Sequence, residues 1–169
     1  DREGELAKAA DIHVDDEDMV AVVKHFSGTL LQVPPMYSAI KVSGKPLYSY
    51  ARSGVEIERA PRTIVIYELK LEIIADQMMK MSVTCSKGTY VRVLAEDIAK
   101  YLGTGGYLTE LRRTRVGDIG DTETLKLDYL DSLSSSELPR VLRSLDSCLA
   151  GLAKITVSNE FKTRLINGL

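Results

Sequence analysis

Residues 63–103 read TIVIYELKLEIIADQMMKMSVTCSKGTYVRVLAEDIAKYLG, and this stretch decides the fold class of the chain. Residues 63–74 and 79–85 are rich in side chains that favour strands, and both runs alternate apolar and polar residues over part of their length. Residues 75–77, Ala-Asp-Gln, stand between the two runs and suit a turn. Because alternation with a period of two lets one face of a strand meet a core, the two runs predict an antiparallel hairpin.

A helix is expected directly after the hairpin, over residues 90–102. Thr89 can cap its N-terminus, and Gly103 can end it because glycine readily adopts the left-handed conformation that often follows a helix. An earlier amphipathic helix is expected where the acids of residues 15–18 precede spaced apolar residues and Gly28 follows them. This order of elements predicts an α+β fold with a mixed, largely antiparallel sheet and flanking helices.

The other segments have weaker periodicity. Residues 30–54 contain three prolines and two glycines, so they predict a long loop or excursion. Residues 111–117 return to extended character. After Asp121 the chain looks helical and polar, with a serine loop at residues 134–136.

Composition bounds the class of protein. With 169 residues, 44% of them apolar, the chain can build one core and at most one and a half domains. Two cysteines and two widely spaced histidines exclude a disulfide scaffold and a zinc site of ordinary spacing. No run approaches the ~20 apolar residues that a membrane-spanning helix needs. These features are typical of a globular protein in a reducing compartment.

The net charge of −2 argues against a nucleic-acid partner, but the charge is uneven along the chain. Residues 1–32 carry a net charge of −5, whereas residues 33–63 carry +3 and residues 84–120 carry +2. Two basic windows therefore follow an acidic start. Charge alone leaves two readings open, an RNA-facing surface or an ordinary solvated surface.

The turn between the hairpin and the helix is the first candidate for chemistry. Residues 86–89, Ser-Lys-Gly-Thr, join a strand to a helix N-terminus, where backbone N–H groups and Lys87 can hold a phosphate. Tyr90 and Arg92 follow in the first turn, and the planar guanidinium of Arg92 suits a carboxylate or phosphate partner. The alternative is a plain helix start with a core tyrosine and an exposed arginine. Cys85 is expected to be a small apolar filler rather than a nucleophile.

Residues 32–52 interleave three tyrosines with lysine and arginine, a pattern that suits stacking on bases and neutralising phosphates. Residues 112–115, Arg-Arg-Thr-Arg, form a compact basic cluster. Each signal is weak by itself. His13 and His25 are expected to be surface residues rather than metal ligands.

Taken together, these stretches resemble the TruB family of tRNA pseudouridine synthases. Residues 32–54, QVPPMYSAIKVSGKPLYSYARSG, resemble one family signature, and residues 85–117, CSKGTYVRVLAEDIAKYLGTGGYLTELRRTRVG, resemble the motif around the family's active-site arginine. The opening Asp-Arg-Glu-Gly at residues 1–4 and the end at residues 159–169 resemble the family at consistent spacing. The resemblance implies isomerisation of a T-loop uridine of tRNA to pseudouridine. In that reaction the base is flipped out, detached from its ribose with an aspartate as nucleophile, and rejoined through carbon.

The resemblance also implies roles for particular residues. Arg92 matches the arginine that pairs with the catalytic aspartate, Tyr90 matches the tyrosine of the uracil pocket, and Leu111 matches an apolar residue near the base. Residues 35–62 resemble a thumb-like insertion that closes over the RNA, which favours a stand-alone enzyme over a guide-RNA-dependent one. The expected RNA-binding residues are Tyr37, Lys41, Lys45, Arg52, Lys87, Arg112 and Arg113. The family resemblance implies a monomer in the cytoplasm whose partner is the T stem-loop of tRNA, with no membrane, no metal ion and no organic cofactor.

One family element has no counterpart in these residues, the G-x-L-D-x-x-A-x-G segment that carries the nucleophilic aspartate. Residues 144–151 share its Leu-Asp pair, but they lack the preceding glycine and follow the arginine motif, so Asp146 is not expected to be the nucleophile. We therefore expect a fragment, inactive alone, of a longer enzyme. Residues 1–131 are expected to be the C-terminal portion of the catalytic domain, and residues 132–169 a linker and the beginning of a small C-terminal RNA-binding domain. An RNA-binding module without catalysis is the alternative.

Overall fold

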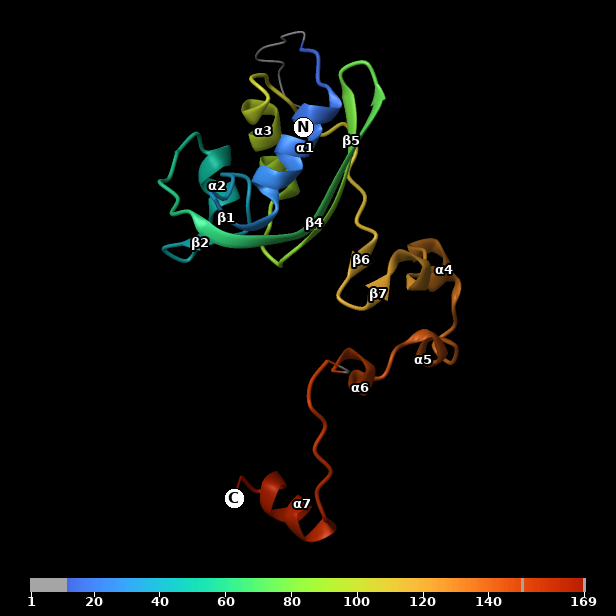
Figure 1. Ribbon diagram of the computed structural model, residues 1–169. Helices are drawn as coiled ribbons and strands as arrows, with labels where there is room; N and C mark the ends of the chain where they lie inside the picture. The colour runs from blue at the N-terminus through green and yellow to red at the C-terminus, as the bar shows by residue number, and fades with distance from the viewer. Residues whose placement is uncertain (1–11, 150, 169) are drawn as a thin grey trace. The chain divides into compact units, whose positions relative to one another are not determined.

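The computed structural model describes residues 12–149 and 151–168 of the chain. The chain divides into two compact units, residues 1–112 and residues 113–169 (Figure 1). The first unit contains the three-stranded sheet and the long helices, and the second contains short helices and a two-stranded hairpin. Antiparallel pairing with flanking helices confirms the α+β expectation.

The sheet of the first unit has the strand order β1-β4-β5, with every pair antiparallel. Strand β4 (Arg62–Ala75) pairs with β1 (Gly28–Gln32) on one side and with β5 (Met78–Cys85) on the other, which confirms the predicted hairpin. Ile64 and Ile66 are buried on the same face of β4, yet the next buried residue is Leu69 rather than Glu68. A register shift between Ile66 and Glu68 explains this, because one extra residue on a strand moves the following side chains to the opposite face.

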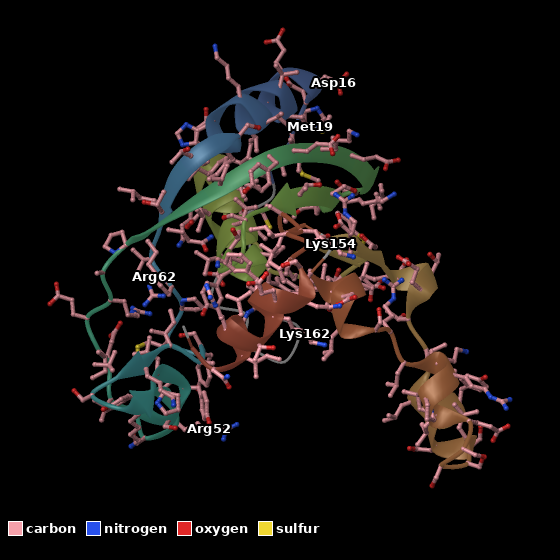
Figure 2. The ribbon with its side chains drawn as sticks, turned by 90° about the horizontal axis from the view of Figure 1, so that it is seen from below. Asp16, Met19, Arg52, Arg62, Lys154 and Lys162 are labelled. Atoms are coloured by element: carbon pink, nitrogen blue, oxygen red, sulfur yellow. The ribbon has the colours of Figure 1, made fainter. Side chains whose placement is uncertain are left out.

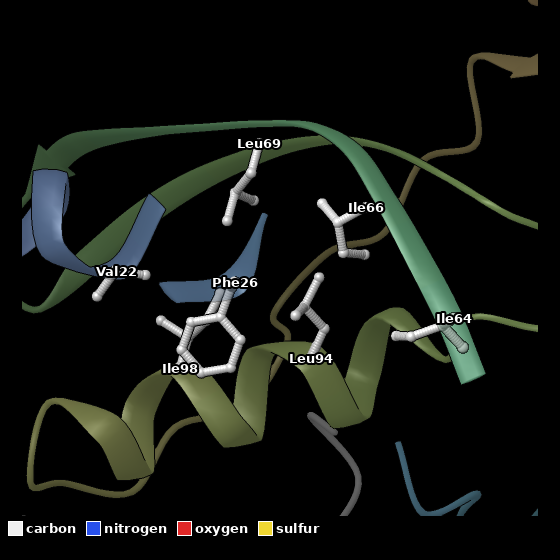
Figure 3. Packing of buried hydrophobic residues seen from close by; sticks show 7 residues of the cluster. All are labelled: Val22, Phe26, Ile64, Ile66, Leu69, Leu94 and Ile98. Carbon is white, nitrogen blue, oxygen red and sulfur yellow. The ribbon is translucent and has the colours of Figure 1, made fainter. Parts of the chain in front are cut away.

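Helices α1 (Asp16–Phe26) and α3 (Val91–Tyr101) lie on the same side of the curved sheet (Figure 1). Helix α1 begins with a capping box, in which the Asp15 carboxylate accepts from the Asp18 N–H at 2.9 Å and the Asp18 carboxylate accepts from the Asp15 N–H at 3.2 Å. Both helices face the sheet with apolar side chains, and Figure 3 shows these meeting between α3 and β4. The core cluster consists of Val22, Phe26, Ile64, Ile66, Leu69, Leu94 and Ile98.

Residues 30–54 are not one long loop, so that prediction was wrong in part. Their first residues complete β1, and the next elements are β2 (Lys41–Val42), β3 (Lys45–Pro46) and α2 (Leu47–Arg52). The hairpin β2–β3 turns through residues 43 and 44, which have φ of 51° and 78°, the positive values that a two-residue turn requires. Strand β1 was not predicted because its partner strand β4 lies at least 30 residues further along the chain. The residues next to β1 do not reveal this pairing.

The second unit contains the hairpin β6 (Arg115–Val116) and β7 (Ile119–Gly120), a 3₁₀ turn at Asp121–Glu123, and four short helices. The helices are α4 (Leu127–Ser132), α5 (Leu138–Val141), α6 (Leu145–Cys148) and α7 (Asn159–Ile166). The Gly120 N–H and the Arg143 guanidinium both bind Glu123 and hold the pKa of its carboxyl below the usual value. None of the described residues 113–149 and 151–168 is buried, so these elements share no apolar core within the described part of the unit. Over both units, no described helix is long and apolar enough to span a membrane.

A close approach behind α3 gives a test of the packing. A Cβ added at Gly106 would lie 2.6 Å from the Cβ of Ala99, a buried residue of α3. We expect Gly106→Ala to lower the free energy of unfolding by about 1–3 kcal/mol, because neither atom belongs to a flexible side-chain end. Gly151→Ala is the control, since nothing lies within 4 Å of its added Cβ. Urea unfolding followed by circular dichroism measures both, and equal midpoints would contradict the packing of residue 106 on α3.

Candidate nucleic-acid interface

The turn that connects β5 to α3 is held rigidly on the sheet. The Ser86 N–H donates to the Val65 carbonyl at 2.8 Å, and the Val65 N–H donates to Ser86 Oγ at 2.9 Å. Ser86 Oγ also lies 3.5 Å from Thr89 Oγ1, and Gly88 has a φ of +85°, which lets the chain reverse direction here. Ser86 therefore fixes the place at which α3 starts.

Tyr90 is the N-cap residue of α3, one position later than predicted. Thr89 does not cap the helix, because its hydroxyl faces Ser86 and no side chain of the helix start caps the N–H groups. Instead Gln32, at the end of β1, pairs with the backbone of Tyr90: Gln32 Oε1 accepts from the Tyr90 N–H at 2.8 Å, and Gln32 Nε2 donates to the Tyr90 carbonyl at 3.1 Å. No role was predicted for Gln32. It could have been recognised only as a polar residue whose side chain is buried at the end of a strand, and β1 itself was not predicted.

Arg92 joins the start of α3 to the segment that follows β1. Its Nη2 donates to the carbonyl oxygen of Tyr37 at 3.2 Å, across 55 residues of sequence, and the arginine itself is half-buried. Two of the residues singled out from the sequence are thus brought together. The Tyr37 ring is exposed, so it is available to a partner while its backbone holds Arg92.

A cavity of about 410 Å³ opens beside Tyr90. Two cations, Arg62 and Lys87, line it together with the apolar side chains of Ile40 and Ile64. Its described lining residues are Ala39, Ile40, Arg62, Thr63, Ile64, Lys87, Gly88 and Tyr90. A pocket with an aromatic ring, apolar walls and two cations can receive a planar base and its phosphate. Arg62 was missed from the sequence, although it lies directly opposite Gln32 in the β1–β4 register.

Three further predicted RNA-binding residues of the first unit lie on the β2–β3 hairpin and α2. Lys41, Lys45 and Arg52 are all exposed. The Lys45 ammonium lies 4.9 Å from the centre of the Tyr50 ring, and the Arg52 guanidinium lies 5.3 Å from that of Tyr48. Such cation–aromatic pairs keep charged groups extended over rings at the surface.

Charge is separated within the first unit. Figure 2 shows Arg52 and Arg62 toward one end of it, and Asp16 and Met19, at the start of α1, toward the other. Asp16, one of the acids at the start of α1, therefore lies at the end of the unit away from Arg62, which lines the cavity. Basic side chains can thus gather at one end of the unit although the net charge of the chain is negative.

Three other predicted site residues, Leu111, Arg112 and Arg113, are not among the described residues that line the cavity. Leu111 is 61% exposed and is not among the described residues that line the cavity. Arg112 ends the first unit and Arg113 begins the second, where the exposed Asp146 also lies on α6. The assignments of these residues stay predictions.

Cys85, His13 and His25 were not expected to take part in catalysis or metal binding. Cys85 is half-buried and packs against the core cluster. His13 is exposed, and the exposed His25 ring stacks on Tyr101 with ring centres 4.6 Å apart. Among residues 12–149 and 151–168, no three His, Cys, Asp or Glu side chains lie together in a group that could hold a metal ion.

Known protein families match most of the chain. Residues 1–91 match the TruB family pseudouridylate synthase N-terminal domain, and residues 92–150 match the tRNA pseudouridylate synthase B C-terminal domain. The tRNA pseudouridine synthase B of Psychrobacter arcticus is 45% identical over 95% of this chain and 42% of its own length. The protein of the same name from Nitrosospira multiformis is 44% identical over 99% of this chain and 56% of its own length. The chain thus spans about half the length of these relatives.

A solved structure agrees with the sequence matches. A chain in the crystal structure of a Cbf5-Nop10-Gar1 complex is 26% identical and has a TM-score of 0.58, covering 79% of this chain and 38% of that one. The family matches meet between residues 91 and 92, inside the first turn of α3, while the compact units meet between residues 112 and 113. The predicted domain boundary near residue 131 stays a prediction. Because more than half of the residues of this chain match the N-terminal family domain alone, the chain belongs to the TruB family of pseudouridylate synthases.

Proposed function

We propose that this chain forms the RNA-facing part of a tRNA pseudouridine synthase that converts a T-loop uridine to pseudouridine. The observation that carries the proposal is the placement of Tyr90 and Arg92. Tyr90 lies in the N-terminal family match and Arg92 is the first residue of the C-terminal match. Both lie at the start of α3, where Tyr90 lines a cavity together with Arg62 and Lys87. The backbone of this segment is fixed before any RNA arrives, by Gln32 and Ser86. When a site is already ordered, less of the binding free energy is lost to ordering its side chains and loops.

The proposed division of labour follows from the chemistry of each group. The Tyr90 ring offers a flat face to a uracil that has left its stack in the loop. The Arg92 guanidinium can hold a carboxylate ionised and oriented for attack on the ribose carbon that bears the base. Rejoining the base through carbon returns an isomer of the substrate, so no oxidant or reductant is consumed. We propose that the chemistry needs neither a metal ion nor an organic cofactor.

The attacking aspartate is proposed to come from outside these 169 residues. The sequence lacks the family segment that carries it, since residues 144–151 share only its Leu-Asp pair and have no preceding glycine. The chain is accordingly proposed to bind RNA by itself and to isomerise uridine only together with that segment. We propose the T stem-loop of tRNA as its partner, a monomer as its working form, and the cytoplasm as its location.

The RNA backbone is proposed to run from the cavity onto the β2–β3 hairpin and α2. Arg62 and Lys87 would neutralise phosphates beside the flipped nucleotide, while Lys41, Lys45 and Arg52 would contact the stem. The exposed tyrosines between these cations can stack on loop bases. Arg112 and Arg113 are proposed to add phosphate contacts, and Leu111 to pack near the base.

Salt dependence tests this arrangement on the chain itself. We expect Arg62→Ala and Lys87→Ala each to weaken binding of a T stem-loop RNA about fivefold at 0.15 M salt, because each removes one phosphate contact. Affinity falls as salt rises, and the magnitude of this negative slope of log K against log salt should decrease by about 0.9 for each variant. Fluorescence anisotropy with a labelled RNA measures both quantities.

The matched control is Lys80→Ala, an exposed lysine of the same unit whose ammonium is 3.4 Å from Glu72 on the neighbouring strand. It should leave the affinity and the slope unchanged. If it weakened binding as much as Lys87→Ala, the attraction would be diffuse rather than centred on the cavity. Salt-sensitive binding without any pseudouridine, even with the missing segment supplied, would favour the RNA-binding module without catalysis.

A further inference from the structure

Gln32 makes an unusual set of contacts for a residue at the end of an edge strand. Only 4% of it is exposed, and its side-chain amide makes both of its described hydrogen bonds to the backbone of Tyr90, 58 residues away. A side-chain amide carries an NH₂ group with two N–H donors and one carbonyl acceptor, so its oxygen and one N–H can face the N–H and C=O of a single backbone residue. Gln32 therefore pairs through its side chain with the backbone of Tyr90, at the end of a strand that among the described residues pairs with β4 alone.

The backbone of Tyr90 needs this partner. As the N-cap of α3, with φ of −93° and ψ of 101°, Tyr90 has an N–H that takes no part in the helix, and no side chain of the helix start caps it. Its carbonyl accepts twice, from the Leu94 N–H at 3.0 Å and from Gln32 Nε2 at 3.1 Å. Replacing the Gln32 amide therefore removes the described partner of the Tyr90 N–H and leaves the Tyr90 carbonyl with the Leu94 N–H alone, and an unpaired backbone group away from water costs free energy.

The pairing also reaches beyond Tyr90. Residue 32 faces Arg62 in the β1–β4 register, and it directly precedes the segment that carries Tyr37, whose carbonyl accepts from Arg92. Residue 32 thus pairs with the start of β4 through its strand and with the start of α3 through its side chain. These are the elements that line the cavity or hold Arg92.

We infer that Gln32 is a positioning residue of the candidate nucleic-acid interface, which fixes the backbone of Tyr90 so that the Tyr90 ring and Arg92 are preset for a flipped-out nucleotide. The inference rests on the proposed function, because it names what holds the same site in place. Gln32 touches neither the base nor the phosphate in this role. It acts through Tyr90 and through the first turn of α3.

The decisive measurement is hydrogen exchange of the Tyr90 amide, read by NMR on the 169-residue chain. Gln32→Met keeps the length and burial of the side chain but loses both hydrogen bonds, so Tyr90 should exchange at least about tenfold faster while the Ile66 and Leu69 amides of β4 keep their protection. Gln32→Glu keeps the acceptor for the Tyr90 N–H and should give an intermediate rate. Affinity for the T stem-loop should fall in the same order. If Gln32→Met does not fold, the Gln32→Glu variant carries the test alone.

The control is Val22→Ala, which removes buried methyl groups from α1 without touching Tyr90. At a temperature where every variant is folded, it should leave the affinity for RNA within about twofold of the original chain, so a general loss of stability cannot mimic the effect. Wild-type exchange at Tyr90 in the Gln32→Met variant would overturn the inference, and so would faster exchange with unchanged affinity. If the original chain did not bind the T stem-loop at all, the proposed function would fail, and exchange at Tyr90 would still decide whether Gln32 fixes that residue.

Discussion

Replacing Arg92 with alanine is expected to lower pseudouridine formation by about 10²- to 10³-fold, the usual loss when a group that stabilises charge at a reacting centre is removed. Arg92 is half-buried and its guanidinium already donates to the Tyr37 carbonyl at 3.2 Å, so it is preset before substrate binds. Alanine would leave the partner carboxylate unoriented. Because Arg92 is not proposed as a main phosphate contact, affinity for the T stem-loop should fall by much less than turnover.

The assay joins to Asp1 the segment that precedes the matched region in the Psychrobacter arcticus relative, and mass spectrometry of digested RNA measures the pseudouridine formed. Arg92→Lys keeps the charge but not the planar fork of donors, so it should recover only a small part of the activity. The control is Lys100→Ala at the opposite end of α3, where the ammonium lies 3.6 Å from Asp97. Full turnover in Arg92→Ala would show that the role assigned to this residue is wrong.

The elements predicted correctly are those whose signals are local. Helix α1 has its capping box and apolar stripe within about a dozen residues, and the hairpin β4–β5 has its alternation and its turn in one stretch. The end of α3 was also predicted, since Gly103 follows it with a φ of +82°. In each case the sequence near the element contains the partners that stabilise it.

What was missed depends on residues far apart in the chain. Strand β1 exists because β4 supplies its hydrogen bonds, and Gln32 is buried because Tyr90 lies beside it. The N-cap of α3 moved from Thr89 to Tyr90 for the same reason, since the cap comes from another strand rather than from the residues next to the helix. Arg62 resembles any exposed strand arginine until the pairing with β1 brings it to the cavity.

The other large expected effect is a loss of stability when a buried leucine of α3 is shortened. Leu94 is 1% exposed and belongs to the core cluster, and Figure 3 shows it directed from α3 toward Ile66 on β4. Leu94→Ala should lower the free energy of unfolding by about 2–5 kcal/mol, because it removes a buried side chain and leaves a cavity in its place. Small domains are stable by only about 5–15 kcal/mol, so this loss would remove a large share of the stability of the unit.

Leu31→Ala is the matched control, because the same side chain on β1 is 74% exposed and should cost less than about 1 kcal/mol. Urea unfolding of the three chains gives the difference directly. Similar losses for both leucines would contradict the packing of α3 on the sheet. Since α3 carries Tyr90 and Arg92 at its start, Leu94→Ala should also weaken binding of the T stem-loop as the temperature rises, and it should do so in step with the unfolded fraction. A loss of affinity that came before unfolding would instead show that Leu94 sets the position of the first turn of α3, and not only its stability.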